Sequence, residues 1–247
     1  MSKAVRLDKF LADAGKGTRS EVKKFIQKGL VQVNGRTVKK PEKKITEEDR
    51  VELLGNPVSM APEFVYYLLH KPAGYVSATE DRYDRTVMEL IPEARKGMFP
   101  VGRLDKDSEG LLLMTNNGDI INRMMRAANK HEKEYKVTVD KPVTDEFLKE
   151  MAGGVPILDT VTRPCQVEKL GKYKFKIILT QGLNRQIRRM CEALGYEVKE
   201  LRRVRIMNIE LGNLKPGEYR KVTDQELNEL YELIRDSKSE PTPWNNN

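Results

Sequence analysis

Residues 99–119 read FPVGRLDKDSEGLLLMTNNGD, in which a short acidic loop precedes an apolar run. Asp105, Asp107 and Glu109 lie close together in this loop, and Arg103 and Lys106 lie among them. The run GLLLMT that follows has the length and composition of a buried strand. A tight loop beside such a strand can present one side chain rigidly to a cleft. This stretch therefore predicts a strand of a sheet domain and a candidate site next to it.

Three roles are open to these carboxylates. The pair Asp105 and Asp107 could hold Mg²⁺ or Mn²⁺, which prefer carboxylate oxygens, although Arg103 and Lys106 already bring positive charge to the same loop. The acids could instead form a solvated loop with ion pairs. Finally, one of them could be a nucleophile kept ionised by an arginine, because a guanidinium within about 4–6 Å lowers the pKa of an aspartate. The loop alone does not choose between these roles.

The charge of the chain indicates an anionic partner. The 247 residues carry a formal net charge of +8, and residues 1–60 hold 14 Lys and Arg against 8 Asp and Glu. The first quarter of the chain therefore carries most of the excess, and nucleic acid is the leading candidate partner. The length leaves room for a catalytic domain together with a small accessory module.

Several classes of protein are not expected. The only cysteines, Cys165 and Cys191, are not in a CxxC pattern, so we expect neither a disulfide framework nor a zinc site. His70 and His131 have no partner at metal-ligand spacing and are expected to be structural or surface residues. No apolar run approaches the roughly 20 residues of a membrane span. Phosphate-binding glycine motifs are also missing. We expect a cytoplasmic protein without membrane contact, metal or other cofactor.

The N-terminal segment predicts a small helical and hairpin module. Apolar residues recur at helical spacing over residues 7–14, and Thr18 with Glu21 forms a capping box that begins a second helix. VQVNGRTV, residues 31–38, has alternating runs around Asn-Gly, which is a strong hairpin signal. Residues 16–44 contain ten basic and two acidic residues. These lysines could be a solvated helix face, but their concentration favours contact with RNA or DNA.

Residues 5–53, which include RLDKFLADAGKGTRSEVKKFIQKGLVQVNGRTVKK, resemble the S4 RNA-binding domain. The resemblance implies recognition of structured RNA by shape and backbone, with no chemistry in this module. It implies RNA contacts at Arg6, Lys9, Arg19, Lys23, Lys24, Lys28 and Arg36.

A domain boundary is expected in LGNPVSMAP, residues 54–62, because this stretch has glycine, serine and two prolines without periodicity. We predict a first domain over 1–55, a linker over 56–63, a catalytic domain over 64–237 and a disordered tail over 238–247. Strands are expected in FVYYLLHKP, EYKVTVD and KFKIILT, and helices in VTDEFLKEMAGG, LNRQIRRMCEALG and TDQELNELYELIRDS. Their irregular alternation predicts an α+β sheet domain.

Three further stretches carry a second resemblance. GRLDKDSEGLLLMTNNGD, HEKEYKVTV and QGLNRQIRRMCEALGYEVKEL are similar, in this order, to the three motifs of pseudouridine synthases of the RsuA/RluB/RluE/RluF branch. With the S4-like module the resemblance spans residues 5–235. It implies an RNA pseudouridine synthase that needs no cofactor, with a mixed, mostly antiparallel central sheet flanked by helices. HEKEYKVTVDKPVTDEF and GLNRQIRRMCEALGYEVK are most similar to the RluF type, which implies a uridine of 23S ribosomal RNA, with the anticodon of a tyrosine tRNA as a second candidate target.

The resemblance assigns roles residue by residue. Asp105 corresponds to the family's essential aspartate, with Asp107 and Glu109 in support, and Tyr135 to the tyrosine that stacks on the uracil. Arg188 is expected at the edge of its helix, where it would pair with Asp105. Arg103 is expected to fill the gap left by the displaced base. Further RNA or base contacts are expected at Leu104, Lys106, Arg185, Gln186 and Ile187.

Asp105 would assist cleavage of the glycosidic bond by attack at C1′, by attack at C6 of the uracil, or by removal of the 2′ proton. Alternatives to this function are a noncatalytic RNA-binding or ribosome-assembly factor, a small-subunit ribosomal RNA synthase, and, more distantly, a metal-dependent transferase using the DxD pair. A monomer is the default expectation for the oligomeric state.

Overall fold

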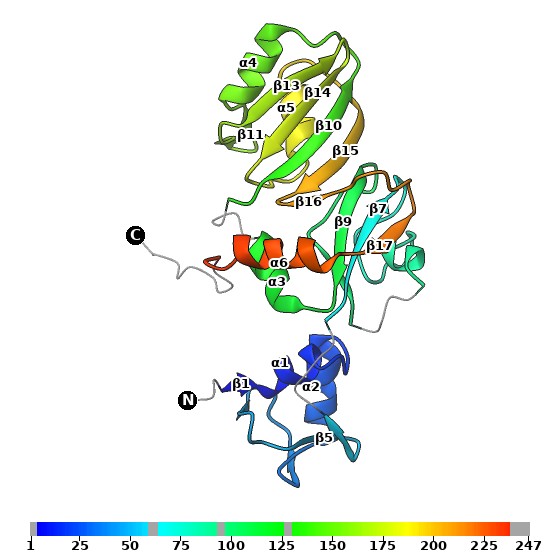
Figure 1. Ribbon diagram of the computed structural model, residues 1–247, viewed down its shortest axis with the longest axis vertical. Coiled ribbons are helices and arrows are strands. Elements are labelled where there is room, and N and C mark those ends of the chain that lie inside the picture. The colour runs from blue at the N-terminus through cyan, green and yellow to red at the C-terminus, as the bar shows by residue number, and fades with distance from the viewer. Residues whose placement is uncertain (1–3, 59–63, 93–96, 126–129, 238–247) are drawn as a thin grey trace. The chain divides into compact units, whose positions relative to one another are not determined.

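The computed structural model describes residues 4–58, 64–92, 97–125 and 130–237 (Figure 1). The predicted tail, 238–247, and positions 59–63 of the predicted linker lie outside these residues. The chain divides into two compact units. One comprises Met1–Val65 with Glu93–Phe99 and Thr115–Gly118, and the other comprises Tyr66–Pro92, Pro100–Met114 and Asp119–Asn247.

The first unit contains two helices, a four-stranded antiparallel sheet and a short strand pair. Helices α1 (Leu7–Asp13) and α2 (Arg19–Gln27) pack their apolar faces against a core that also includes residues of the sheet. The sheet order is β3 (Arg36–Val38), β2 (Val31–Val33), β5 (Val51–Leu53) and β6 (Asn56–Val58), and β1 (Val5–Arg6) pairs with β4 (Lys44–Ile45). These elements confirm the predicted helix pair and hairpin.

Local sequence explains the turns of this unit. The Thr18 side chain accepts from the backbone of Glu21, and the Glu21 carboxylate accepts from the backbone of Thr18, so the predicted capping box is present. Asn34 and Gly35 both have positive φ in the two-residue turn between β2 and β3, as a type I′ hairpin requires.

The sheet of this unit continues past residue 55, into the segment predicted as the linker. Leu54 and Gly55 repeat the positive-φ turn and start another hairpin, so Asn56–Val58 pairs with β5 instead of beginning the linker. Pro57 is tolerated in this strand because β6 lies at the edge of the sheet.

The second unit is built on a nine-stranded mixed sheet. Its main path is β13 (Gln166–Gly171), β14 (Lys174–Leu179), β10 (Lys133–Val139), β15 (Val198–Ile206), β9 (Glu109–Thr115), β7 (Tyr66–Lys71) and β17 (Tyr219–Lys221). β16 (Ile209–Glu210) pairs with β15, and β8 (Phe99–Val101) pairs with β9. Pairing is antiparallel from β13 through β15, whereas β15 and β9 run parallel. This confirms the α+β class and the mixed, mostly antiparallel sheet.

Helices cover the two ends of this sheet separately. Figure 1 shows α4 (Asp145–Gly153) and α5 (Gln186–Ala193) beside β10, β13 and β14, with α3 (Gly118–Met125) and α6 (Asp224–Leu233) beside β7 and β9. Each end has its own apolar core. The remaining short elements are η1 (Val87–Leu90), β11 (Pro156–Ile157) and β12 (Thr160–Val161).

The two ends of the sheet meet where β15 lies against β9. Gly110 of β9 is directly opposite Arg203, and a Cβ atom on Gly110 would lie 2.2 Å from the Arg203 carbonyl oxygen. Only glycine permits this close approach. The acidic loop immediately before β9 is therefore held next to β15 and β10.

Candidate active site

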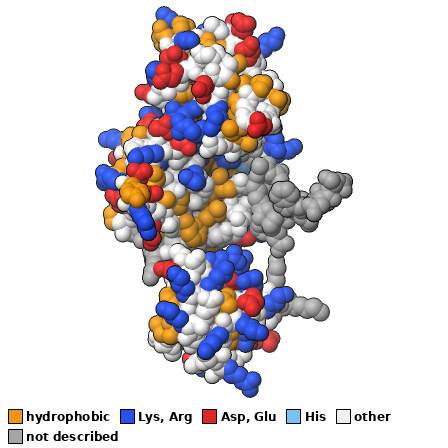
Figure 2. Space-filling view, turned by 180° about the vertical axis from the view of Figure 1, so that it is seen from behind, with side chains coloured by type: hydrophobic (Ala, Val, Ile, Leu, Met, Phe, Trp, Pro, Cys, Tyr) orange, Lys and Arg blue, Asp and Glu red, His pale blue; other side chains and the backbone are white. Residues whose placement is uncertain are grey.

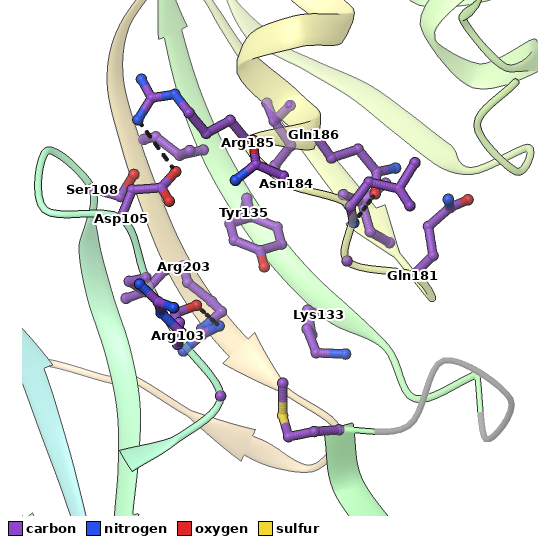
Figure 3. Close-up of a pocket in the computed structure, with 18 of the residues that line it drawn as sticks. Arg103, Asp105, Ser108, Lys133, Tyr135, Gln181, Asn184, Arg185, Gln186 and Arg203 are labelled. Carbon is purple, nitrogen blue, oxygen red and sulfur yellow. Dashed lines mark hydrogen bonds and ion pairs between the residues drawn. The ribbon is translucent and has the colours of Figure 1, made fainter. Parts of the chain in front are cut away.

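A pocket of about 460 Å³ lies at this junction (Figure 3). Its walls come from the acidic loop, strands β10 and β15, and the segment that leads from β14 into α5. The lining residues that carry polar or charged groups include Arg103, Asp105, Ser108, Lys133, Tyr135, Gln181, Asn184, Arg185, Gln186 and Arg203. The pocket thus brings together side chains as far apart in the sequence as Arg103 and Arg203.

The backbone of the acidic loop is held by buried polar side chains. Ser77 donates its hydroxyl to the Leu104 carbonyl at 2.8 Å and accepts from the Leu104 N–H at 3.0 Å. The ammonium group of Lys71, which is fully buried, donates to the carbonyls of Ser108 at 2.7 Å and Lys106 at 3.4 Å. Burial lowers the pKa of Lys71 to about 8, although the nearby Asp107 and Asp105 oppose this shift. The loop is therefore positioned before any ligand binds.

Arg185 links two of the three acids. Its Nη1 atom lies 3.6 Å from Oδ2 of Asp105, and its two terminal nitrogens donate to the carboxylate of Asp107 at 3.2 and 3.1 Å. Arg185 is the residue before helix α5 and has left-handed backbone angles, φ 49° and ψ 35°. This conformation is uncommon outside glycine and fits a residue held at a functional turn.

The expected pairing of Arg188 with Asp105 is wrong. Arg188 instead contacts Asp107, with Nη2 at 3.2 Å from the carbonyl oxygen and 3.3 Å from the carboxylate, and it also donates to the Ser108 hydroxyl at 3.3 Å. The reason is its place in α5, one turn beyond Arg185, where only 15% of its side chain is exposed. From there its guanidinium contacts the backbone of Asp107 and the Ser108 hydroxyl, whereas Arg185 lies beside the carboxylate of Asp105.

The supporting acids are fully engaged. Partial burial disfavours the charge of Asp107, but the hydrogen bonds from Arg185 and the charge of Arg188 outweigh it and lower the pKa of Asp107. Glu109 forms an ion pair with Arg202 of β15. Asp105 keeps 36% of its side chain exposed at the pocket wall, and it is the acid of this loop that faces the pocket.

Tyr135 lies in the middle of the pocket between these groups (Figure 3). It belongs to β10, opposite Arg203 of β15 and opposite Ile177 of β14. Ile187, which is 4% exposed, and Leu104, which is 6% exposed, add apolar surface to the lining of the pocket. This combination of an aromatic ring, apolar walls and one accessible carboxylate suits a flat, polar ring such as a nucleobase.

The other predicted contact residues differ in their availability. Arg103 is exposed and lines the pocket. Gln186 also lines it but is buried, and its side-chain oxygen accepts from the Leu183 backbone at 3.1 Å. Lys106 points elsewhere, because its ammonium group lies 2.5 Å from the carboxylate of Asp84.

Two buried basic residues of the pocket, Lys133 and Arg203, were not expected from the sequence. Lys133 is 7% exposed and Arg203 is 1% exposed. Lys133 stands two residues before Tyr135, so strand periodicity alone places both side chains on one face of β10. Arg203 lacked an equivalent signal, since β15 has the charged sequence VKELRRVRI and was not predicted as a strand.

The histidines and cysteines have structural environments. Nδ1 of His70 is 2.7 Å from the Leu214 carbonyl oxygen, and Nε2 of His131 is 2.8 Å from the Ser237 hydroxyl. Burial raises the pKa of Cys165 to about 11 and that of Cys191 to about 12. Within the described part of the chain, no three His, Cys, Asp or Glu side chains gather as a metal site. The helices of the same residues are all too short or too polar to cross a membrane.

The basic side chains of the first unit are largely exposed. Figure 2 shows Lys and Arg side chains spread over the visible face of this domain. Of the predicted contacts, Lys9 is half-buried, and the exposed ones are Arg6, Arg19, Lys23, Lys24, Lys28 and Arg36. Arg6 is already paired with the buried Asp8, at 2.9 Å, so its guanidinium is the least available of these groups.

Comparisons with known proteins agree with the resemblances found in the sequence. The family described as RNA pseudouridylate synthase matches residues 65–193, and the S4 domain family matches residues 5–51. The dual-specificity RNA pseudouridine synthase RluF of Shigella flexneri is 47% identical over 97% of this chain and 83% of its own length. RluF of Escherichia coli strain K12 is 46% identical over the same shares. A crystal structure of a pseudouridylate synthase matches with a TM-score of 0.68 and 32% identity, and it covers 92% of this chain and 99% of that one.

Proposed function

The chain belongs to the RNA pseudouridylate synthase family and is an RNA pseudouridine synthase, and from this premise we propose its target and the residues that act on it. We propose that it isomerises a uridine of large-subunit ribosomal RNA and, as a second target, the anticodon uridine of a tyrosine tRNA. Support comes from the two RluF relatives, which are described as dual-specificity enzymes and are similar over nearly the whole chain.

Asp105 is the proposed catalytic carboxylate. The reaction breaks the bond between N1 and C1′, turns the uracil and joins C5 to C1′, with no net oxidation or reduction. Attack at C1′, attack at C6 of the uracil and removal of the 2′ proton all require an ionised carboxylate beside the target nucleotide. Asp105 fits this requirement because it faces the pocket and has Arg185 within 3.6 Å. The guanidinium of Arg185 orients this carboxylate.

Tyr135 and Arg103 are the proposed base-handling residues. A uridine within folded RNA must leave its stack before this chemistry, which costs a few kcal/mol. Stacking on Tyr135, in a pocket that Ile187 and Leu104 also line, would offset part of that cost. Arg103 is exposed at the mouth of the same pocket, where it can fill the space that the base leaves.

The S4 domain is the proposed source of affinity for the RNA backbone. Its exposed lysines and arginines carry most of the net charge of the chain, and such contacts hold RNA without reading its sequence. We further propose that the enzyme acts as a monomer in the cytoplasm, without membrane contact. The cytoplasm is proposed because the target RNAs are there, and the monomer is the default state.

The observation that carries this proposal is the convergence of Asp105, Tyr135 and Arg185 in one pocket (Figure 3). Pseudouridine mapping of ribosomal RNA and tRNA, with and without the gene, tests it directly. One large-subunit uridine and one tRNA anticodon uridine should lose their modification in the deletion strain. Unchanged maps would favour a noncatalytic ribosome-assembly role, and a change in small-subunit RNA would correct the target.

A further inference from the structure

Among the residues that the structure describes, two buried cations of the pocket have no acidic partner. Arg203 donates there only to carbonyls, with Nε at 2.8 Å from the Leu111 oxygen and Nη1 at 3.5 Å from the Arg103 oxygen. Its Nη2 atom is buried and has no hydrogen-bond partner within the described part of the chain. Lys133 has one contact with the same residues, 3.3 Å from its ammonium nitrogen to the His131 carbonyl oxygen.

Such an arrangement is unfavourable in the free protein. A buried charge is normally paired with an opposite charge, because carbonyl contacts replace only part of the lost hydration. Here the positive charges of Arg203 and Lys133 also oppose each other, and together with burial this lowers the pKa of Lys133 to about 8. A ligand that brings a negative charge to this site would relieve both costs.

The sheet fixes where that charge would lie. Arg203 is directly across from Tyr135 on the neighbouring strand, and Lys133 is two residues before Tyr135 on the same strand. All three therefore project from one face of the sheet, and all line the pocket. In Figure 3, Tyr135 lies between Asp105 and Lys133. Arg203 and the exposed Arg103 lie nearer to the acidic loop.

We propose that Lys133 and Arg203 form an anion subsite that holds a phosphodiester oxygen of the target nucleotide while its base stacks on Tyr135. This rests on the proposed function, since it takes the target uridine to enter this pocket. A phosphodiester is favoured over a uracil carbonyl because it carries a full negative charge, which can pair with the positive charges of the two buried side chains. The planar guanidinium also matches the geometry of phosphate oxygens.

The subsite would bind the phosphate of the displaced nucleotide, in addition to the stacking of its base on Tyr135. A nucleotide outside the pocket keeps its phosphate in water, so this contact is made only after the base has moved. Binding energy of this kind favours the displaced state over the stacked state. Lys133 and Arg203 are thus binding residues for the reactive conformation, distinct from the proton and bond chemistry assigned to Asp105.

The test uses synthetic RNA stem–loops that carry the mapped uridine. In one, a neutral methylphosphonate replaces the phosphate on the 5′ side of the target uridine, and in another it replaces the phosphate on the 3′ side. A 2′-deoxy sugar precedes each altered linkage to prevent chain cleavage, and each RNA is compared with a natural-phosphate RNA of the same sugar composition. Binding is measured for both RNAs, and pseudouridine formation under single-turnover conditions is measured for the 5′ version.

For the wild-type enzyme, one of the two methylphosphonates should weaken binding or turnover by on the order of 10- to 100-fold, the scale of a charge-assisted hydrogen bond. Lys133→Met should lose most of this difference and handle the neutral and natural linkages alike. Lys133→Arg, which keeps the charge, should retain the difference. Lys136→Met removes an exposed lysine from the same strand and should behave as wild type.

Two results would overturn the subsite. In the first, neither methylphosphonate has an effect on the wild-type enzyme, or Lys133→Met shows the full wild-type effect. In the second, Lys133→Met suppresses the effect of replacing O2 or O4 of the uracil with sulfur while the methylphosphonate effect persists, which would assign these cations to the base. Both results require that the wild-type enzyme modifies the natural RNA. If it does not, the proposed function itself has failed, and this outcome is distinct from failure of the subsite. Thermal melting of each variant confirms that it is folded.

Discussion

The guanidinium of Arg185 lies 3.6 Å from the carboxylate of Asp105, although the two residues are in different loops of the chain. Arg185 also holds Asp107, and Arg188 holds the backbone of the same loop from below. The two arginines thus divide two tasks. Arg185 brings positive charge to the Asp105 carboxylate, and Arg188 keeps the loop in place.

Asp105→Asn should abolish pseudouridine formation while leaving RNA affinity nearly unchanged. The amide keeps the shape of the side chain but cannot act as nucleophile or base, so a loss on the order of 10⁴-fold or more is expected. Asp107→Asn is the matched control in the same loop, and its loss should be far smaller, about tenfold. Single-turnover assays on the mapped RNA measure both. Activity in Asp105→Asn would remove this residue from the chemistry.

Arg185→Gln and Arg188→Gln should fail in different ways. Arg185→Gln should lower kcat by about 10²-fold with little change in melting temperature, because it removes charge beside Asp105. Arg188→Gln should lower the free energy of unfolding by about 1–3 kcal/mol, because the Asp107 and Val198 carbonyls lose their donors. Arg189→Gln, on the same helix and outside the pocket lining, controls for loss of an arginine from α5. Equal effects of the first two variants would contradict this division.

Neutralising Lys23, Lys24 and Lys28 together should weaken RNA binding and flatten its dependence on salt. All three are exposed on or just after α2, and each phosphate contact contributes about 0.7–0.9 to the slope of log affinity against log salt. Glutamine substitutions should therefore reduce the slope by about 2. The control replaces Lys169, Lys172 and Lys174, which are exposed on the β13–β14 hairpin. If both triple variants lose the same slope, the S4 domain is not the main backbone contact.

Much of the fold could be predicted from local patterns. Three predicted features depend only on neighbouring residues, and all three are present. They are the Asn34-Gly35 hairpin, the capping box at Thr18 and the strand that follows the acidic loop. β15 could not be found in this way, because its alternation is carried by arginines whose burial depends on the facing strands. The full extent of the first sheet was missed for a related reason, since β6 is a strand only because β5 pairs with it.

For the candidate site, the sequence motifs name three residues that share one pocket, Asp105, Tyr135 and Arg103. The motifs do not give the pairings between charged side chains. Which arginine reaches Asp105 depends on the left-handed backbone of Arg185 and on the depth of Arg188 under the loop. These are properties of the folded chain, and helical periodicity could place Arg188 at an edge but not identify its partner.

The free energy of unfolding of the RNA-free enzyme should depend on pH because the ammonium group of Lys133 is buried in the pocket. Burial, with the nearby charge of Arg203, lowers the pKa of Lys133 from 10.5 to about 8. Between these two values the unfolded chain binds more protons than the folded one, so the contribution of Lys133 makes the protein more stable as pH rises from 8 to 10.5. Below pH 8 the full cost is present, on the order of 3 kcal/mol.

Lys133→Met should therefore exceed the wild type in free energy of unfolding below pH 8, and its advantage should shrink as the pH approaches 10.5. Urea unfolding at several pH values measures this difference, with Lys136→Met as the control for removing a lysine from β10. Polyphosphate or RNA bound in the pocket would mask the effect, so the protein must be freed of nucleic acid first. The difference in free energy of unfolding between Lys133→Met and wild type could instead stay constant across this pH range. That result would mean that the ammonium group of Lys133 is hydrated or paired in solution. That outcome would also remove the energetic basis for an anion subsite beside Tyr135.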